Sequence, residues 1–140
     1  MTNSHQHTRL TLDNSLTELD RLTETLEQCN KEWRLSDKLV LQLNLVLEEL
    51  FTNAVCYGYE DDSKQKIDFV FLLRNDEIQI TMCDNGRPFD PTTPEDPALD
   101  EPLSDKQIGG LGIFLARQYT DTLDYRREEN KNIVTLTKKI

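Results

Sequence analysis

A carboxylate and an amide stand one helical turn apart in the apolar segment that follows Ser36. Helical spacing of apolar residues predicts a helix over about residues 36–57, with Glu49 and Asn53 together at one border of its apolar stripe. An amide oxygen can hold a hard cation such as Mg²⁺, and a carboxylate can orient or deprotonate a nucleophile. On the helix alone, an ordinary surface acid and a satisfied amide remain the simpler explanation. The stripe itself comprises Leu39, Leu43, Val46, Leu47, Leu50 and Ala54.

A second carboxylate, Asp84, follows the apolar strand pattern of residues 78–83 and precedes Asn85-Gly86. A carboxylate fixed at a strand end can accept a hydrogen bond from an exocyclic amine, which distinguishes adenine from guanine at that edge. The alternative is turn chemistry alone, because Asp-Asn-Gly is a favourable turn sequence in many settings.

Glycine and proline gather in one part of the chain. All five prolines fall between Gly86 and Gly109, and the five glycines fall between Gly58 and Gly112. A proline-rich loop of about 20 residues in a small domain is usually a lid or binding loop, or else disordered. Gly58 is expected only to end the preceding helix. The other glycines bracket the loop.

The sequence Gly109-Gly110-Leu111-Gly112 opens a predicted helix over residues 108–119. Consecutive unobstructed backbone N–H groups at a helix N-terminus favour an anion. The pattern is neither the dinucleotide fingerprint nor the P-loop, because it lacks GxGxxG after a first strand and Gly-Lys-Ser/Thr. Taken together, these elements supply a metal ligand, a base, an adenine reader, a phosphate cradle and a lid.

Length and composition limit the class of protein. A chain of 140 residues with 36% hydrophobic content is expected to form a single domain, with residues 1–7 as a flexible tail. A net charge of −10 argues against nucleic acid. The polar N-terminus and the absence of a long apolar run argue against secretion and a membrane span. Three widely spaced cysteines fit free thiols in the cytoplasm.

The remaining patterns predict the elements that position these residues. Ser15 or Asn14 should cap a first helix that ends near Asn30, with Glu18 completing a capping box. The partly alternating order of helices and hairpins favours an α+β two-layer sandwich, with a mostly antiparallel sheet covered on one face by helices. The expected strands are residues 7–12, 66–73, 77–83, 122–127 and 132–139.

The order and spacing of these motifs resemble the GHKL ATP-binding superfamily, which has a histidine kinase-like ATPase fold. Residues 49–54 resemble its N box, residues 84–90 its first glycine box, and residues 109–112 its second. Within the superfamily the whole chain is most similar to the small bacterial anti-sigma factor serine/threonine kinases. Histidine kinase itself is not favoured, because the only histidines, His5 and His7, lie in the expected tail.

The resemblance implies a role for each matching residue. Asn53 would coordinate Mg²⁺, Glu49 would be the general base, and Asp84 would bind the adenine amino group. Gly86 would give ATP room, and residues 86–109 would form the ATP lid. Where many relatives have a threonine near adenine, this sequence has Asn132. Phosphate contacts are expected from Gly110, Leu111 and Gly112, with Lys106 and then Arg87 as weaker candidates.

The resemblance also implies a cytoplasmic enzyme that phosphorylates a STAS-type anti-anti-sigma partner. In its other state the kinase would hold a sigma factor, and a homodimer is expected. The alternative is a non-enzymatic module in which ATP gates partner binding. The long proline-rich loop and the acidic composition motivate that alternative.

Overall fold

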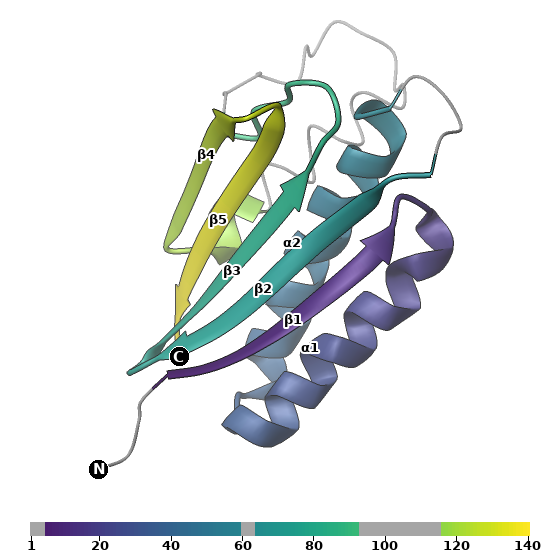
Figure 1. Cartoon of the computed structure of the whole chain (residues 1–140). Helices are drawn as coiled ribbons and strands as arrows, with labels where there is room; N and C mark the ends of the chain where they lie inside the picture. Colours follow the sequence, from purple (N-terminus) through teal and green to yellow (C-terminus); the bar gives the residue numbers. More distant parts are fainter. Residues whose placement is uncertain (1–4, 60–63, 93–115) are drawn as a thin grey trace, which may run out of the picture.

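The chain forms a two-layer α+β sandwich in the computed structural model, which describes residues 5–59, 64–92 and 116–140. Five antiparallel strands make one sheet in the order β1-β2-β3-β5-β4 (Figure 1). The central strands β3 and β5 are far apart in sequence but pair directly, with Asp84 opposite Asn132. The strands are β1 (His5–Asp13), β2 (Lys66–Arg74), β3 (Glu77–Asp84), β4 (Thr122–Glu128) and β5 (Lys131–Lys139).

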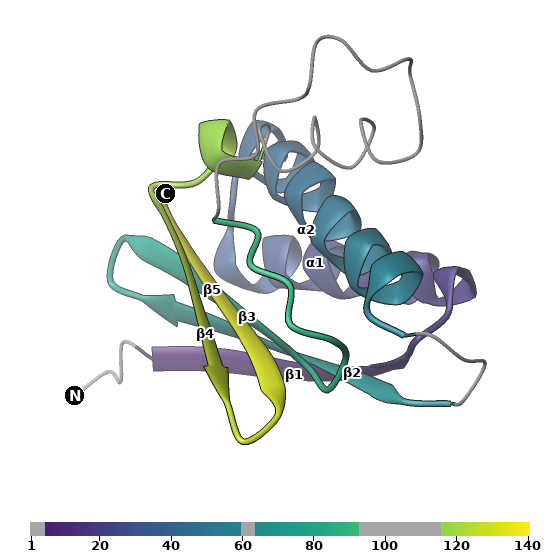
Figure 2. The same cartoon turned by 90° about the horizontal axis from the view of Figure 1, so that it is seen from above.

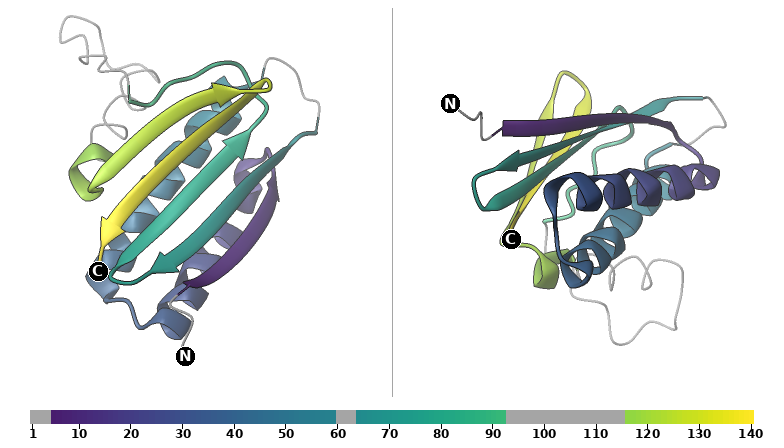
Figure 3. Two further views of the ribbon diagram at one scale, coloured as in Figure 1. Left: turned by 60° about the vertical axis from the view of Figure 1, so that its left-hand side comes forward. Right: turned by 90° about the horizontal axis from the view of Figure 1, so that it is seen from below.

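Both long helices lie on one face of this sheet, and in the described ranges no helix covers the opposite face (Figures 2 and 3). They are α1 (Leu19–Trp33), entered through the 3₁₀ turn η1 (Leu16–Glu18), and α2 (Asp37–Tyr57). As predicted, Ser36 caps α2 by accepting a hydrogen bond from the Leu39 backbone N–H at 3.1 Å. The α+β sandwich expected from the sequence is therefore confirmed.

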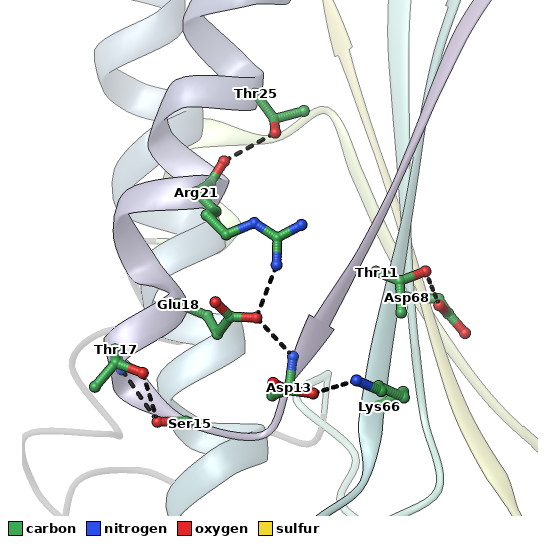
Figure 4. Close-up of polar contacts among 9 residues, drawn as sticks. All are labelled: Thr11, Asp13, Ser15, Thr17, Glu18, Arg21, Thr25, Lys66 and Asp68. Carbon is green, nitrogen blue, oxygen red and sulfur yellow. Dashed lines mark hydrogen bonds and ion pairs between the residues drawn. The ribbon is translucent and has the colours of Figure 1, made fainter.

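The junction between β1 and α1 differs from the predicted capping box. Ser15 caps the 3₁₀ turn, but the Glu18 carboxylate accepts from the backbone N–H of Asp13 at 2.9 Å rather than from Ser15 (Figure 4). Glu18 also pairs with Arg21 at 3.0 Å. Because the 3₁₀ turn brings Glu18 close to the last residue of β1, the side chain ties the helix to the sheet.

The core lies between α1, α2 and the helix-facing side of the sheet. Strand β3 alternates buried and half-buried residues along its whole length, as a sheet with one covered face requires. Phe51 of α2 and Phe69 and Phe71 of β2 are fully buried, with ring centroids 6.1–6.2 Å apart. By length and composition α2 could cross a membrane, but its apolar residues form part of this core.

The remaining elements follow the predictions with shifted ends. Strand β1 begins at His5, so residues 5–7 are not the flexible tail that the sequence suggested. Backbone pairing continues to the end of β2, where His5 stands opposite Arg74. Helix α1 extends three residues beyond Asn30, to Trp33. Residues 116–119 are helical, whereas the rest of the predicted helix lies outside the described residues.

Candidate active site

The inner border of α2 carries the predicted pair of polar side chains. Asn53 is only 4% exposed, and its Nδ2 has no hydrogen-bond partner within the described part of the chain. Glu49, one turn earlier, is half-buried, and this burial raises the pKa of its carboxyl group. The nearby Asn53 amide opposes that shift, although no well-aligned hydrogen bond from Nδ2 forms. Thus α2 supplies an unsatisfied amide and a partly desolvated carboxylate.

Asp84 ends β3 as a buried carboxylate, 5% exposed. Its Oδ1 accepts hydrogen bonds from the Gly86 backbone N–H at 2.9 Å and from the Asn132 amide at 3.0 Å. Burial raises the pKa of Asp84, and these two donors and the Arg127 charge oppose the rise. Within the described residues Oδ2 accepts no hydrogen bond. The Asp84 carboxylate is therefore held at one oxygen, while the other is available to a ligand.

Gly86 packs directly against Gly58 at the C-terminal end of α2. A Cβ atom on Gly86 would lie 2.7 Å from the carbonyl oxygen of Gly58 and 3.0 Å from Oδ1 of Asp84. The Gly58 carbonyl also accepts the backbone N–H of Arg87 at 2.7 Å. Gly58 thus does more than end the helix, because its contact with Gly86 joins α2 to the segment after β3.

Arg87, the weakest of the predicted phosphate contacts, binds the C-terminal end of α2 in this structure. Its Nε and one terminal nitrogen donate to the carbonyl oxygen of Tyr57 at 3.1 and 2.7 Å. Carbonyls in the last turn of a helix lack intrahelical donors, so the guanidinium caps α2. This role could not be predicted from local sequence patterns, because the contact joins residues 30 positions apart.

A narrow pocket lies between α2 and the strands β3 and β5. Its volume is about 10 Å³, which is space for roughly one water molecule. The segment after β3 runs back between α2 and the strands (Figure 2) and contributes Phe89 and the buried Pro91. The pocket is lined by Leu50, Asn53, Ala54, Gly58, Met82, Asp84, Arg87, Phe89, Pro91, Asn132 and Val134.

The structure thus brings Asn53 and Asp84 to the walls of one pocket, although they are on different elements. Glu49 is adjacent to Asn53 on α2 but is not among the lining residues. Gly86 lies behind Asp84, against Gly58. The predicted phosphate contacts Lys106, Gly110, Leu111 and Gly112 lie outside the described residues, as does the predicted lid beyond Thr92.

Asn132 is the main site residue whose contacts could not be read from the sequence. It is 3% exposed, and its amide contacts Asp84, Arg87, Phe89, Tyr125 and Arg127. Its position opposite Asp84 follows from the register of β3 against β5.

A family profile for the histidine kinase-like ATPase domain matches residues 12–138 of this chain. The chain belongs to the histidine kinase-like ATPase domain family. The profile spans both walls of the pocket, from the end of β1 to the end of β5. The resemblance to this superfamily that residues 49–54 and 84–90 suggested is thereby confirmed.

Curated relatives place the chain near one branch of the family. It is 32% identical over 104 residues to the serine/threonine-protein kinase BtrW of Bordetella bronchiseptica, covering 74% of this chain and 73% of the relative. It is 28% identical to the serine-protein kinase RsbW of Listeria monocytogenes, with 71% of this chain and 66% of the relative covered. The anti-sigma F factor of Clostridium perfringens is 27% identical, with 69% of each chain covered. These relatives support a protein kinase of the anti-sigma factor type.

Solved structures agree on the fold. The RsbU and RsbW domains of a Mycobacterium tuberculosis protein match 96% of this chain and 32% of that chain, with a TM-score of 0.68 and 14% identity. The histidine kinase domain of a blue-light activated kinase from Erythrobacter litoralis covers 89% of this chain and 60% of that chain, with a TM-score of 0.53 and 17% identity.

Proposed function

We propose that this protein is a cytoplasmic, Mg²⁺-ATP-dependent serine/threonine kinase that phosphorylates a STAS-type anti-anti-sigma partner. One observation carries the proposal: an unsatisfied buried amide, Asn53, and a half-engaged buried carboxylate, Asp84, line the same pocket. Family membership and the similarity to named serine kinases support a nucleotide as the ligand of that pocket.

The chemistry around Asp84 suits an adenine base. Oδ2 of Asp84 is an acceptor and therefore suits a hydrogen-bond donor. At C6 of the purine ring adenine has an amine, which is a donor, whereas guanine has a carbonyl, which is an acceptor. Leu50, Ala54, Met82 and Val134 give the pocket apolar walls for a flat base. Because the cavity has room for only about one water molecule, Phe89 and Pro91 would have to move outward when a base enters.

The chemistry around Asn53 suits a hard cation. Leaving the buried amide nitrogen of Asn53 without a partner costs free energy. Because no hydrogen bond from this nitrogen holds the amide among the described residues, the side chain could take the orientation that a ligand requires. Rotation of the amide exchanges its nitrogen and oxygen, and the oxygen is a ligand that Mg²⁺ accepts. When bound, Mg²⁺ would neutralise charge on the phosphate oxygens during transfer.

Glu49 is proposed as the general base. Its raised pKa makes it a better proton acceptor than an exposed glutamate, and its position one turn before Asn53 puts it beside the cation ligand. The carboxylate would take the proton from the serine or threonine hydroxyl of the partner, while Asn53 and the backbone around Gly110 and Gly112 position the phosphates. Positioning and charge neutralisation would supply most of the rate.

The partner proposals come from the relatives. Serine-protein kinases named RsbW and an anti-sigma F factor are among them, so a STAS-type anti-anti-sigma protein is the proposed substrate and a sigma factor the proposed second partner. Among the described strands β1 pairs only with β2, and this edge of the sheet would allow the proposed homodimer.

The rate of phosphotransfer by the Glu49→Gln variant tests the assignment of Glu49 as the general base. With γ-labelled ATP and a STAS-type partner, the variant should lose roughly 10²- to 10⁴-fold in rate, the usual worth of a general base. Glu48→Gln is the matched control, because Glu48 lies on the same helix and accepts a hydrogen bond from Asn44 at 3.1 Å. Equal rates for Glu49→Gln and the wild type would overturn the base assignment.

The same experiment separates the kinase from the non-enzymatic alternative. If the wild type binds Mg²⁺-ATP and changes its affinity for the partner but yields no phosphoserine or phosphothreonine, the protein is an ATP-gated binding module. Nucleotide entry would displace Phe89 and Pro91 under either function, so the phosphorylated product is what distinguishes the two.

A further inference from the structure

Both the nitrogen and the oxygen of the Asn132 amide form hydrogen bonds within the protein. Its Nδ2 donates to Oδ1 of Asp84 at 3.0 Å and to the backbone carbonyl of Arg87 at 2.7 Å. Both N–H groups of the amide are therefore engaged, one by the carboxylate that lines the pocket and one by the segment after it.

The carbonyl end of the same amide is held from β4. Oδ1 of Asn132 accepts the Tyr125 hydroxyl at 2.6 Å and a terminal nitrogen of Arg127 at 3.0 Å. The backbone N–H of Phe89 lies 3.4 Å from it, at the long end of the hydrogen-bonding range. Arg127 also donates to the Gly86 carbonyl at 2.7 Å. Side chains of the β4–β5 hairpin are therefore hydrogen-bonded to the backbone of Gly86, Arg87 and Phe89.

This arrangement decides which oxygen of Asp84 a ligand meets. Asn132 and the Gly86 N–H both donate to Oδ1, so the carboxylate cannot rotate without losing two hydrogen bonds. A threonine at position 132 has one hydroxyl hydrogen and could not donate to Asp84 and Arg87 together. An aspartate would place a second carboxylate against the first.

We propose that Asn132, braced by Tyr125 and Arg127 of β4, is a positioning residue that sets the preference of the pocket for adenine, which has an amine at C6, over guanine, which has a carbonyl there. It would do so by aiming the free oxygen of Asp84 at the base and by tethering residues 86–89 to the β4–β5 hairpin. The inference rests on the proposed function, since it takes the ligand to be ATP.

The test compares ATP and GTP binding by calorimetry for the wild type, Asn132→Leu and Tyr125→Phe. Asn132→Leu keeps the branching and the number of heavy atoms of the side chain but removes every hydrogen bond. It should reduce the ratio of ATP to GTP affinity by about 10- to 100-fold, the worth of a hydrogen bond to a charged group. Tyr125→Phe removes one hydroxyl and should reduce the ratio by about 2- to 10-fold. General damage to the pocket would weaken both nucleotides alike and leave the ratio unchanged.

The control is Thr135→Val, on β5 but on the sheet face away from the helices, where its hydroxyl is 3.5 Å from that of Thr81. It should keep the wild-type ratio. If Asn132→Leu does not fold, Tyr125→Phe decides by the same criterion. A wild type without preference for ATP would overturn the proposed adenine site itself. A wild type that prefers ATP, with variants that keep the preference or bind ATP more tightly, would overturn only the role of Asn132.

Discussion

Replacing Gly86 by alanine should destabilise the protein and weaken ATP binding together. The added Cβ would lie 2.7 Å from the Gly58 carbonyl oxygen and 3.0 Å from Oδ1 of Asp84. Gly86 does not have a positive φ, so the cost comes from these contacts and not from backbone strain. The Gly58 carbonyl cannot yield easily, because it accepts the Arg87 N–H at 2.7 Å.

Overpacking of this kind usually costs about 1–3 kcal/mol. For a chain of 140 residues, a loss of that size lowers the melting temperature by about 3–10 °C. Relief of the clash would also push residues 86–87 away from α2 and turn Asp84, so ATP affinity should fall with stability. The Asp84–Gly86 hydrogen bond of 2.9 Å is the contact most directly lost.

Urea unfolding and calorimetric ATP titration of the same preparations measure both effects. Pro88→Ala is the control, since Pro88 is an exposed side chain in the same segment and its loss should cost at most about 1 kcal/mol. A Gly86→Ala protein as stable as the wild type, with unchanged ATP affinity, would refute the close approach of Gly86 to Gly58.

Two further predictions concern Arg87 and Glu49. Arg87→Ala should lower the free energy of unfolding by about 1 kcal/mol, because the exposed guanidinium caps the Tyr57 carbonyl. A phosphate contact would instead weaken ATP binding and leave unfolding in urea unchanged. Burial raises the pKa of Glu49 above its ordinary 4.5, so the folded protein holds this proton to higher pH than the unfolded chain does. The Glu49 contribution to stability therefore falls as pH rises from about 4.5 through the folded pKa, and is constant above it. Glu49→Gln should gain stability relative to the wild type across that window in paired urea titrations, and a pH-independent difference would contradict it.

Local patterns were enough to predict the described elements and part of the candidate site. Alternation along residues 78–83 and helical spacing along residues 39–54 fixed which side chains face the core, and so where Asp84 and Asn53 lie. The two-residue turn at Glu129 and Asn130 was visible as a polar break between strands, and both residues have positive φ.

What the sequence could not supply were contacts between distant segments. Asn132 faces Asp84 only because β5 pairs with β3 in one register, which no pattern within either strand specifies. The contact of Gly86 with Gly58 depends on where α2 ends relative to β3. The Glu18 carboxylate likewise accepts a hydrogen bond from the Asp13 backbone N–H instead of that of Ser15, because the 3₁₀ turn brings Glu18 close to the end of β1.

Calorimetric titration of Mg²⁺-ATP into the wild type, Asp84→Asn and Asn53→Ala tests the central claim most directly. The claim is that the pocket between α2, β3 and β5 is the ATP site. The wild type should bind ATP, Asp84→Asn should bind at least about 10-fold more weakly, and Asn53→Ala should lose the dependence on Mg²⁺. Wild-type protein that binds no ATP, or that binds it no better than the two variants, would contradict the claim.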